Sequence, residues 1–253
     1  MTKPMDPSSS PSLDTCRITV VYDNHPYREG LDTAWGFGCL IRGAEKLILF
    51  DTGRDDPYLL GNMEKLGIDP NEVEIVVLSH IHRDHVGGLG RFLERNPGVT
   101  VYFPASFPKS FRESVKKSGA KTVPVKEPLE ICPGVFSTGE MGFRIKEQGL
   151  VLKTKKGLLV ITGCAHPGVF KMVKRAGEHF GENVHFVLGG FHLLATPGFR
   201  VKGIVKSFRK AGVRYVGPCH CSGDKAIGIF EKEYQERFLK VGVGREITLE
   251  NLP

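Results

Sequence analysis

The sequence contains no long apolar run. No hydrophobic stretch reaches the roughly 18 residues that a membrane span needs, so no membrane partner is expected. We also find no signal peptide. The six cysteines have spacings that fit neither a zinc ribbon nor a disulfide framework. Together these features predict a cytoplasmic protein with reduced thiols.

A concentrated basic region is also missing, although the net charge is +7 and the pI about 9.1. The densest basic groups, at 153–156 and 171–175, are short. Such groups are typical of solvated faces and do not favour nucleic acid as a partner. The positive charge instead suits a small-molecule substrate that is anionic.

Composition places few limits on folding. The chain has 253 residues, of which 40% are hydrophobic and 25% charged, as in an ordinary globular protein. Residues 1–14 are rich in Ser and Pro and are predicted to form a disordered N-terminal tail. No linker divides the remainder, so we expect a single domain over 15–253.

Strand-like and helix-like patterns alternate along the chain, which predicts two packed sheets flanked by helices. Short apolar runs predict strands at 17–22, 38–42, 46–50, 73–78, 99–103, 135–137, 149–154, 158–162, 184–188, 214–217 and 246–249. Helical spacing predicts helices at 57–66, with Asp56 as N-cap, and at 87–95, 106–118, 169–180, 201–211 and 222–231.

Four of the predicted strands end in a turn that carries a histidine. These residues are His80, His166, His192 and His220. Strand ends at one edge of a sheet lie close together, and functional groups collect there because the sheet holds them rigidly. We therefore expect the four histidines to share one site.

The first of these turns is the strongest signal in the sequence, because His80, His82, Asp84 and His85 lie within six positions. Imidazole and carboxylate groups suit zinc, with manganese or iron as alternatives. In an extended turn His80 and His82 point the same way, whereas Asp84 and His85 follow where the chain bends into a helix. The cluster predicts a site for one or two metal ions.

This run, His-x-His-x-Asp-His followed by Gly-Gly-Leu, resembles the signature of the metallo-β-lactamase superfamily. The upstream Asp-Thr-Gly at 51–53 is similar to another motif of that superfamily, and the resemblance extends from about Cys16 onward. It implies an α/β (α+β) fold, the four-layer αββα sandwich, with the metal site at the sheet edges. It also implies that Asp51 orients a metal-binding histidine.

Further motifs resemble the branch named for 7,8-dihydropterin-6-methyl-4-(β-D-ribofuranosyl)aminobenzene-5′-phosphate synthase. They lie at 23–24, 35–37, 62–63, 162–168, 189–193 and 218–223. The branch implies a reaction in which an aminobenzene compound attacks a carbon of a pterin and the metal binds a pyrophosphate leaving group. Because one fold hosts several reactions, the resemblance supports the metal site more strongly than the reaction.

Two positions depart from the usual superfamily pattern. Where a histidine ligand is usual, the turn at 137–140 offers Glu140, and where a bridging aspartate is usual the chain has Cys164. A Cys164 thiolate would be a good zinc ligand, and a buried packing role is the alternative. The resemblance makes His166 and His220 the best remaining ligands, with His166 replacing one that is missing.

Several residues have two open interpretations. His192 is a metal ligand or a catalytic acid/base outside the metal shell, and Asp84 is a ligand that also accepts a proton from water. Strand alternation predicts that Cys219 and Cys221 point away from the site and pack.

Three aromatic residues, Trp35, Phe37 and Phe191, are candidates for stacking on a flat heterocyclic substrate. Core packing is the alternative for each of them.

The primary functional hypothesis is a metal-dependent hydrolase, because a metal lowers the pKa of bound water towards about 7 and polarises a substrate oxygen. The substrate would be an ester, a lactone, a phosphodiester or a pterin. The alternatives are the synthase reaction, which makes the enzyme a transferase, and a non-catalytic metal-binding protein. A nuclease would need a basic arm or an added RNA-handling domain. A flavodiiron-type oxidoreductase would need Glu in the first motif, where position 82 is His.

Overall fold

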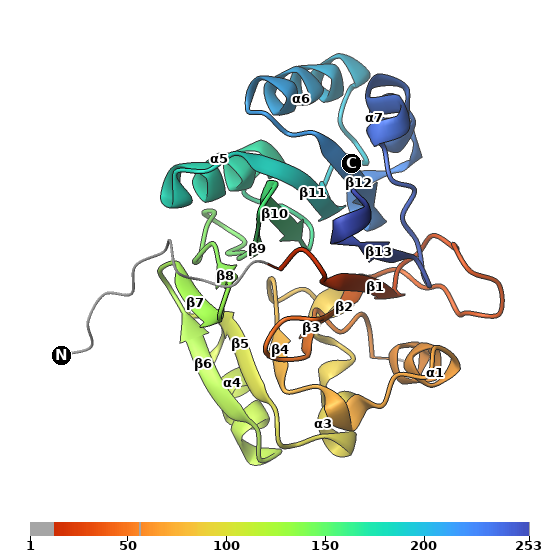
Figure 1. Cartoon of the computed structure of the whole chain (residues 1–253). Helices are drawn as coiled ribbons and strands as arrows, with labels where there is room; N and C mark the ends of the chain where they lie inside the picture. The colour runs from red at the N-terminus through yellow and green to blue at the C-terminus, as the bar shows by residue number, and fades with distance from the viewer. Residues whose placement is uncertain (1–12, 56, 253) are drawn as a thin grey trace.

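The computed structural model describes residues 13–55 and 57–252, and its strands form two sheets (Figure 1). The first sheet has the order β13-β1-β2-β3-β4-β5-β6. Its strands are antiparallel from β13 to β3 and parallel from β3 to β6. They are β1 (Arg17–Tyr22), β2 (Gly38–Arg42), β3 (Ile48–Phe50), β4 (Ile75–Val77), β5 (Thr100–Pro104), β6 (Lys121–Val125) and β13 (Glu246–Thr248).

The second sheet has the order β12-β11-β10-β9-β8-β7. It is antiparallel from β7 to β10 and parallel from β10 to β12. Its strands are β7 (Leu129–Cys132), β8 (Val135–Ser137), β9 (Leu150–Thr154), β10 (Gly157–Thr162), β11 (Val184–Gly190) and β12 (Tyr215–Cys219).

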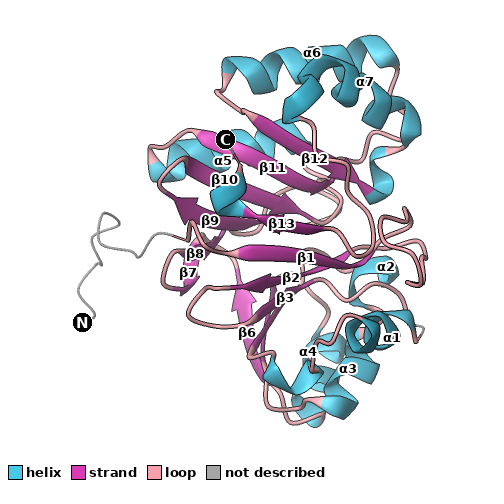
Figure 2. Ribbon diagram, turned by 45° about the vertical axis from the view of Figure 1, so that its right-hand side comes forward, coloured by secondary structure: helices cyan, strands magenta, loops and turns pink. Residues whose placement is uncertain are grey.

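Helices cover the outer face of each sheet, which gives four layers (Figure 2). The first sheet is covered by α1 (Tyr58–Lys65), α3 (Leu89–Arg95) and α4 (Lys109–Lys117), and the second by α5 (Val169–Phe180), α6 (Gly198–Lys210) and α7 (Asp224–Tyr234). One buried apolar cluster lies between the two sheets. A second lies between the second sheet and its helices, and a third lies between the first sheet and its helices. The predicted αββα arrangement is confirmed.

Most predicted elements are present with small shifts at their ends, but two strands were not predicted. β6 and β7 are short, and several of their side chains are only partly buried. β6 lies at the edge of its sheet and contains Pro124, which edge strands tolerate. The predicted helix 87–95 is present as α3, which begins at Leu89, and a separate short helix that was not predicted, α2 (Arg83–Val86), precedes it.

The predicted N-terminal tail lies mostly in residues 1–12, outside the described residues. The predicted N-cap Asp56 also lies outside them. Leu13, inside the predicted tail, is only 3% exposed and its N–H donates to the Lys153 carbonyl oxygen at 3.1 Å. The packed part of the chain therefore includes residue 13. None of the described helices is long and apolar enough to span a bilayer.

Candidate metal centre

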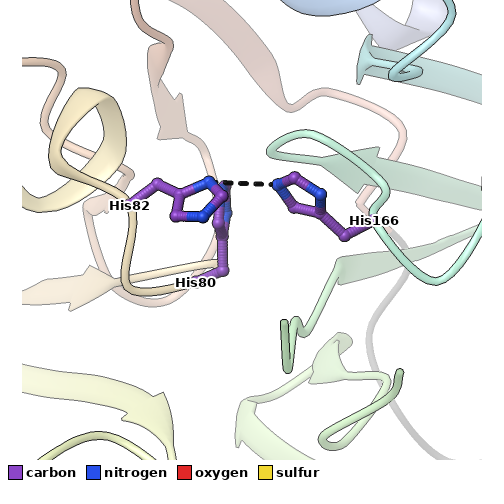
Figure 3. A group of neighbouring side chains, drawn as sticks. All are labelled: His80, His82 and His166. Atoms are coloured by element: carbon purple, nitrogen blue, oxygen red, sulfur yellow. Dashed lines mark hydrogen bonds between the residues drawn. The ribbon is translucent and has the colours of Figure 1, made fainter. Parts of the chain in front are cut away.

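The histidine-bearing strand ends meet where the two sheets face each other. His80, His82 and His166 place their ring nitrogens within 4.8 Å of one another (Figure 3). Nδ1 of His82 and Nε2 of His166 share a hydrogen bond of 3.2 Å, although the two residues follow strands of different sheets. We call these three residues the first triad. Three converging imidazoles form a typical zinc-binding set.

Asp84, His85 and His220 form a second triad with ligand atoms within 4.8 Å of one another. An Asp84 carboxylate oxygen lies 3.4 Å from Nε2 of His220 and 3.7 Å from Nε2 of His85. Residues 80 and 82 of the motif thus belong to the first triad and residues 84 and 85 to the second. Each triad is a group of side chains that could hold a metal ion.

Hydrogen bonds fix the tautomer of His80. The Ser79 hydroxyl donates to Oδ2 of Asp51 at 2.7 Å, so its oxygen accepts a proton from Nδ1 of His80 at 2.8 Å. Nε2 of His80 then carries a lone pair, and this buried atom has no partner among the described residues. A buried imidazole nitrogen with a free lone pair is what a metal ligand requires.

The second triad is oriented in the same way. Nδ1 of His85 donates to Oδ2 of Asp51 at 2.7 Å, and Nδ1 of His220 donates to Oδ1 of Asn24 at 2.9 Å. Nε2 of His220 is buried and lacks a partner within the described part of the chain. The orientation of a histidine by Asp51, which the resemblance implied, is present in the structure. These residues fit one or two metal ions.

The local electrostatics favour the neutral forms of His80 and His166 and the ionised form of Asp84. At His85 burial acts to lower the pKa, but the charge of Asp51 overcomes it and raises that pKa. Burial, followed by neighbouring imidazoles, lowers the pKa of His80, and similar causes lower the pKa of His166 to about 4. Burial acts to raise the pKa of Asp84, but the imidazoles of His220 and His85 beside its carboxylate overcome this effect and lower that pKa. Neutral imidazoles and an ionised carboxylate are the forms that bind metals.

A third group of possible ligands contains Cys164, His192 and Cys221. Sγ of Cys164 lies 3.2 Å from Nε2 of His85 and also groups with His80, so it stands between the two triads. The prediction that Cys221 points away from the site is wrong. Its strand ends at Cys219 and the 3-10 turn η3 (His220–Ser222) follows, so alternation no longer applies.

His192 is exposed, and its ring centroid lies 4.3 Å from that of His166. Trp35 is 42% exposed, and its ring centroid lies 5.0 Å from that of His220. Both side chains are thus placed to meet a molecule that approaches the triads.

Phe37 and Phe191, however, are 0% and 1% exposed. Phe37 packs edge-on against Phe50 between the sheets, and Phe191 packs against Phe230 beneath α7. Side chains with this burial do not fit a stacking role, so the packing alternative describes them.

Glu140 belongs to none of the ligand groups among the described residues. Its backbone N–H donates to the Lys126 carbonyl oxygen, and its carboxylate accepts from the Ser106 N–H at 2.8 Å. These contacts tie the side chain to neighbouring loops and give no support to Glu140 as a ligand, so that role stays a prediction.

Glu147 is the residue that the sequence analysis missed. It is fully buried, and its carboxylate accepts from the N–H groups of Cys164, Ala165 and His166 at 3.0, 2.7 and 2.8 Å. Burial raises its pKa to about 7, against the lowering effect of those three donors. The carboxylate thus shapes the turn that presents His166 to the first triad. No motif marked Glu147, because its partners are backbone groups.

Replacing Glu147 by Gln is expected to weaken zinc binding about 10- to 100-fold, the usual range for residues that support ligands. The amide has one acceptor oxygen where the carboxylate has two, so the turn loses part of its hydrogen bonding. Competition with a chromogenic chelator measures the change. Glu140→Gln is the matched control and should bind zinc like the parent protein. Equal affinities in the two variants would contradict this role for Glu147.

The turns of the site hold strained backbone. Among the described residues, positive φ outside glycine occurs at Gln235 and at four positions in the site: Asp51, Ala165, His192 and His220, with φ between 48 and 61°. This region is uncommon for residues with a Cβ. Its concentration here indicates that the surrounding structure imposes the turns in order to position side chains.

Comparison with known proteins supports the same assignment. A profile of the metallo-β-lactamase superfamily matches residues 39–177, which is more than half of the chain. The chain is 32% identical to the 7,8-dihydropterin-6-methyl-4-(β-D-ribofuranosyl)-aminobenzene-5′-phosphate synthase of Methanocaldococcus jannaschii, over 93% of this chain and 97% of that protein.

Solved structures agree with this result. Tm1679, described as a metal-dependent hydrolase of the β-lactamase superfamily, has a TM-score of 0.76 and 30% identity, with 92% of this chain and 98% of that chain covered. The short form of human tRNase Z has a TM-score of 0.62 at 13% identity, covering 92% and 99% of the two chains, and shows the fold alone. The chain belongs to the metallo-β-lactamase superfamily and is an enzyme of the hydrolase or transferase class.

Proposed function

We propose that this enzyme is a zinc-dependent hydrolase of anionic small molecules that carry a phosphate or a pterin-like ring. The two adjacent triads, with histidine lone pairs directed inward, are the observation that carries the proposal. Imidazole, carboxylate and nearby thiol groups favour zinc over harder ions such as magnesium. When bound, zinc would supply Lewis acidity and lower the pKa of a bound water.

In this proposal the chain's own residues have separate tasks. The first triad and the second triad hold the metal, and Asp51 and Asn24 keep the imidazoles in the required tautomer. The Asp84 side chain is 19% exposed, so it is placed to accept a proton beside the metal. The exposed His192 is placed to donate a proton to a leaving group at the mouth of the site.

The synthase reaction is the second candidate. Its support is the 32% identity over nearly the full length of both chains to the M. jannaschii synthase. The exposed indole of Trp35 beside His220 would suit a flat pterin ring. In this case the enzyme would join two substrates with loss of pyrophosphate from the pterin.

Removing the metal should abolish either reaction, and one assay separates them. The protein is treated with a chelator and reloaded with zinc, manganese or iron(II), then given a dihydropterin pyrophosphate ester with and without the aminobenzene ribose phosphate. We expect no turnover without metal and the highest turnover with zinc. A hydrolase releases product from the ester alone, whereas a synthase requires both substrates. Full activity in the chelated protein would overturn the metal-dependent proposal.

A further inference from the structure

An open cavity of about 570 Å³ lies beside the first triad. It reaches His166, and its other walls come from the loop between β8 and β9 and from the start of α5. We call it the His166 pocket and define it by Phe143, Arg144, His166, Pro167 and Lys171. A molecule in this pocket would have one end at a candidate metal ligand.

The pocket has two cations that lack an acidic partner. Arg144 and Lys171 are both exposed, and neither forms an ion pair with any carboxylate in the described part of the chain. By contrast, Lys174 of the same helix pairs with Glu178 at 3.4 Å. Unpaired cations at the edge of a concave surface attract anions, and arginine matches the geometry of phosphate oxygens.

An aromatic side chain completes the pocket. Phe143 is 91% exposed, although phenylalanine is normally buried. The N-terminal turn of α5 contains no acidic residue and adds its positive dipole end to the same wall. The pocket thus offers a positive surface and a flat apolar face next to the metal-binding residues.

We propose that the His166 pocket is a substrate-recognition site for an aromatic or heterocyclic molecule with a phosphate group. Arg144 and Lys171 hold the phosphate, Phe143 stacks on the ring, and the reacting bond lies at the triads. This inference rests on the proposed function, because it places the substrate with respect to the metal. It assigns specificity to three residues outside the metal-binding set.

The test uses phenylphosphonate, which combines an aromatic ring with a dianion and has no ester bond to hydrolyse. Binding to the zinc-loaded protein is followed by calorimetry. We expect saturable binding by the parent protein. The affinity should fall about tenfold in the double variant Arg144→Gln, Lys171→Gln, because hydrogen bonds to charged groups are lost. Phe143→Ala should also weaken binding. Lys174→Gln, one turn further along α5, is the matched control and should bind like the parent.

Metal content is measured in every variant, and His82→Ala is included. Loss of binding in the double variant with normal zinc content supports the pocket, whatever the turnover assay shows. Absence of binding in the parent protein would overturn the inference. Unchanged affinity in the double variant would also overturn the inference. If only His82→Ala then lost binding, the anion would be assigned to the metal and not to the pocket. The proposed function is judged separately, by turnover.

Discussion

The His82→Ala variant is expected to lose metal-dependent turnover by about a thousandfold and to hold less zinc per chain. The ring of His82 contributes one of the three converging imidazoles of the first triad and shares a hydrogen bond with His166. Metal ions supply several kcal/mol of transition-state stabilisation, and about 4 kcal/mol corresponds to a thousandfold in rate. Elemental analysis and initial rates on the same preparation measure both effects.

His179→Ala is the control for this variant. His179 is exposed on α5 and belongs to none of the ligand groups among the described residues. Its replacement should leave zinc content and turnover unchanged. If His82→Ala matched this control in both measurements, the assignment of the first triad would be incorrect.

The second large effect is expected from Gly163→Ala at the end of β10. A Cβ at this position would lie 2.1 Å from Oγ of Ser79 and 2.8 Å from Oδ2 of Asp51, closer than real Cβ atoms approach. Both contacted atoms belong to the network that fixes the tautomers of His80 and His85. The methyl group therefore requires the Ser79 and Asp51 side chains, or the strand ends that carry them, to shift.

We expect Gly163→Ala to lower stability by about 1–3 kcal/mol, as overpacking does, and to weaken zinc binding about 10- to 100-fold. Urea unfolding of the metal-free protein and chelator competition measure the two effects. Gly203→Ala is the control, because a Cβ there meets no atom within 4 Å and its position in α6 favours alanine by up to about 1 kcal/mol. Two variants of equal stability and zinc affinity would refute the close-approach argument.

The location of the site could be predicted from the sequence for a simple reason. Buried strands appear in the sequence as apolar runs, and each of four such runs is followed by a turn that carries a histidine. In the structure, His80, His166, His192 and His220 follow β4, β10, β11 and β12 and lie around one centre. His166, His192 and His220 are neighbours because β10, β11 and β12 are adjacent in the second sheet, and His80 joins them because the first sheet packs against the second.

The finer contacts could not be predicted because they depend on backbone conformation. Cys221 faces Cys164 because residue 220 adopts a positive φ and begins a 3-10 turn, which breaks strand alternation. Glu147 acts on three backbone N–H groups that exist as a set only after the turn at 164–166 has formed. β6 lacked a signal because an edge strand needs no continuous apolar run.

The ligand groups also have a temporal order, since the ribosome makes their members at different times. His80 and His82 emerge early, the first triad is complete only with His166, and the second only with His220. The complete set of ligands therefore exists only after β12 and the turn that follows it have been made. A chain that stops before β12 lacks His220 and therefore cannot complete the second triad.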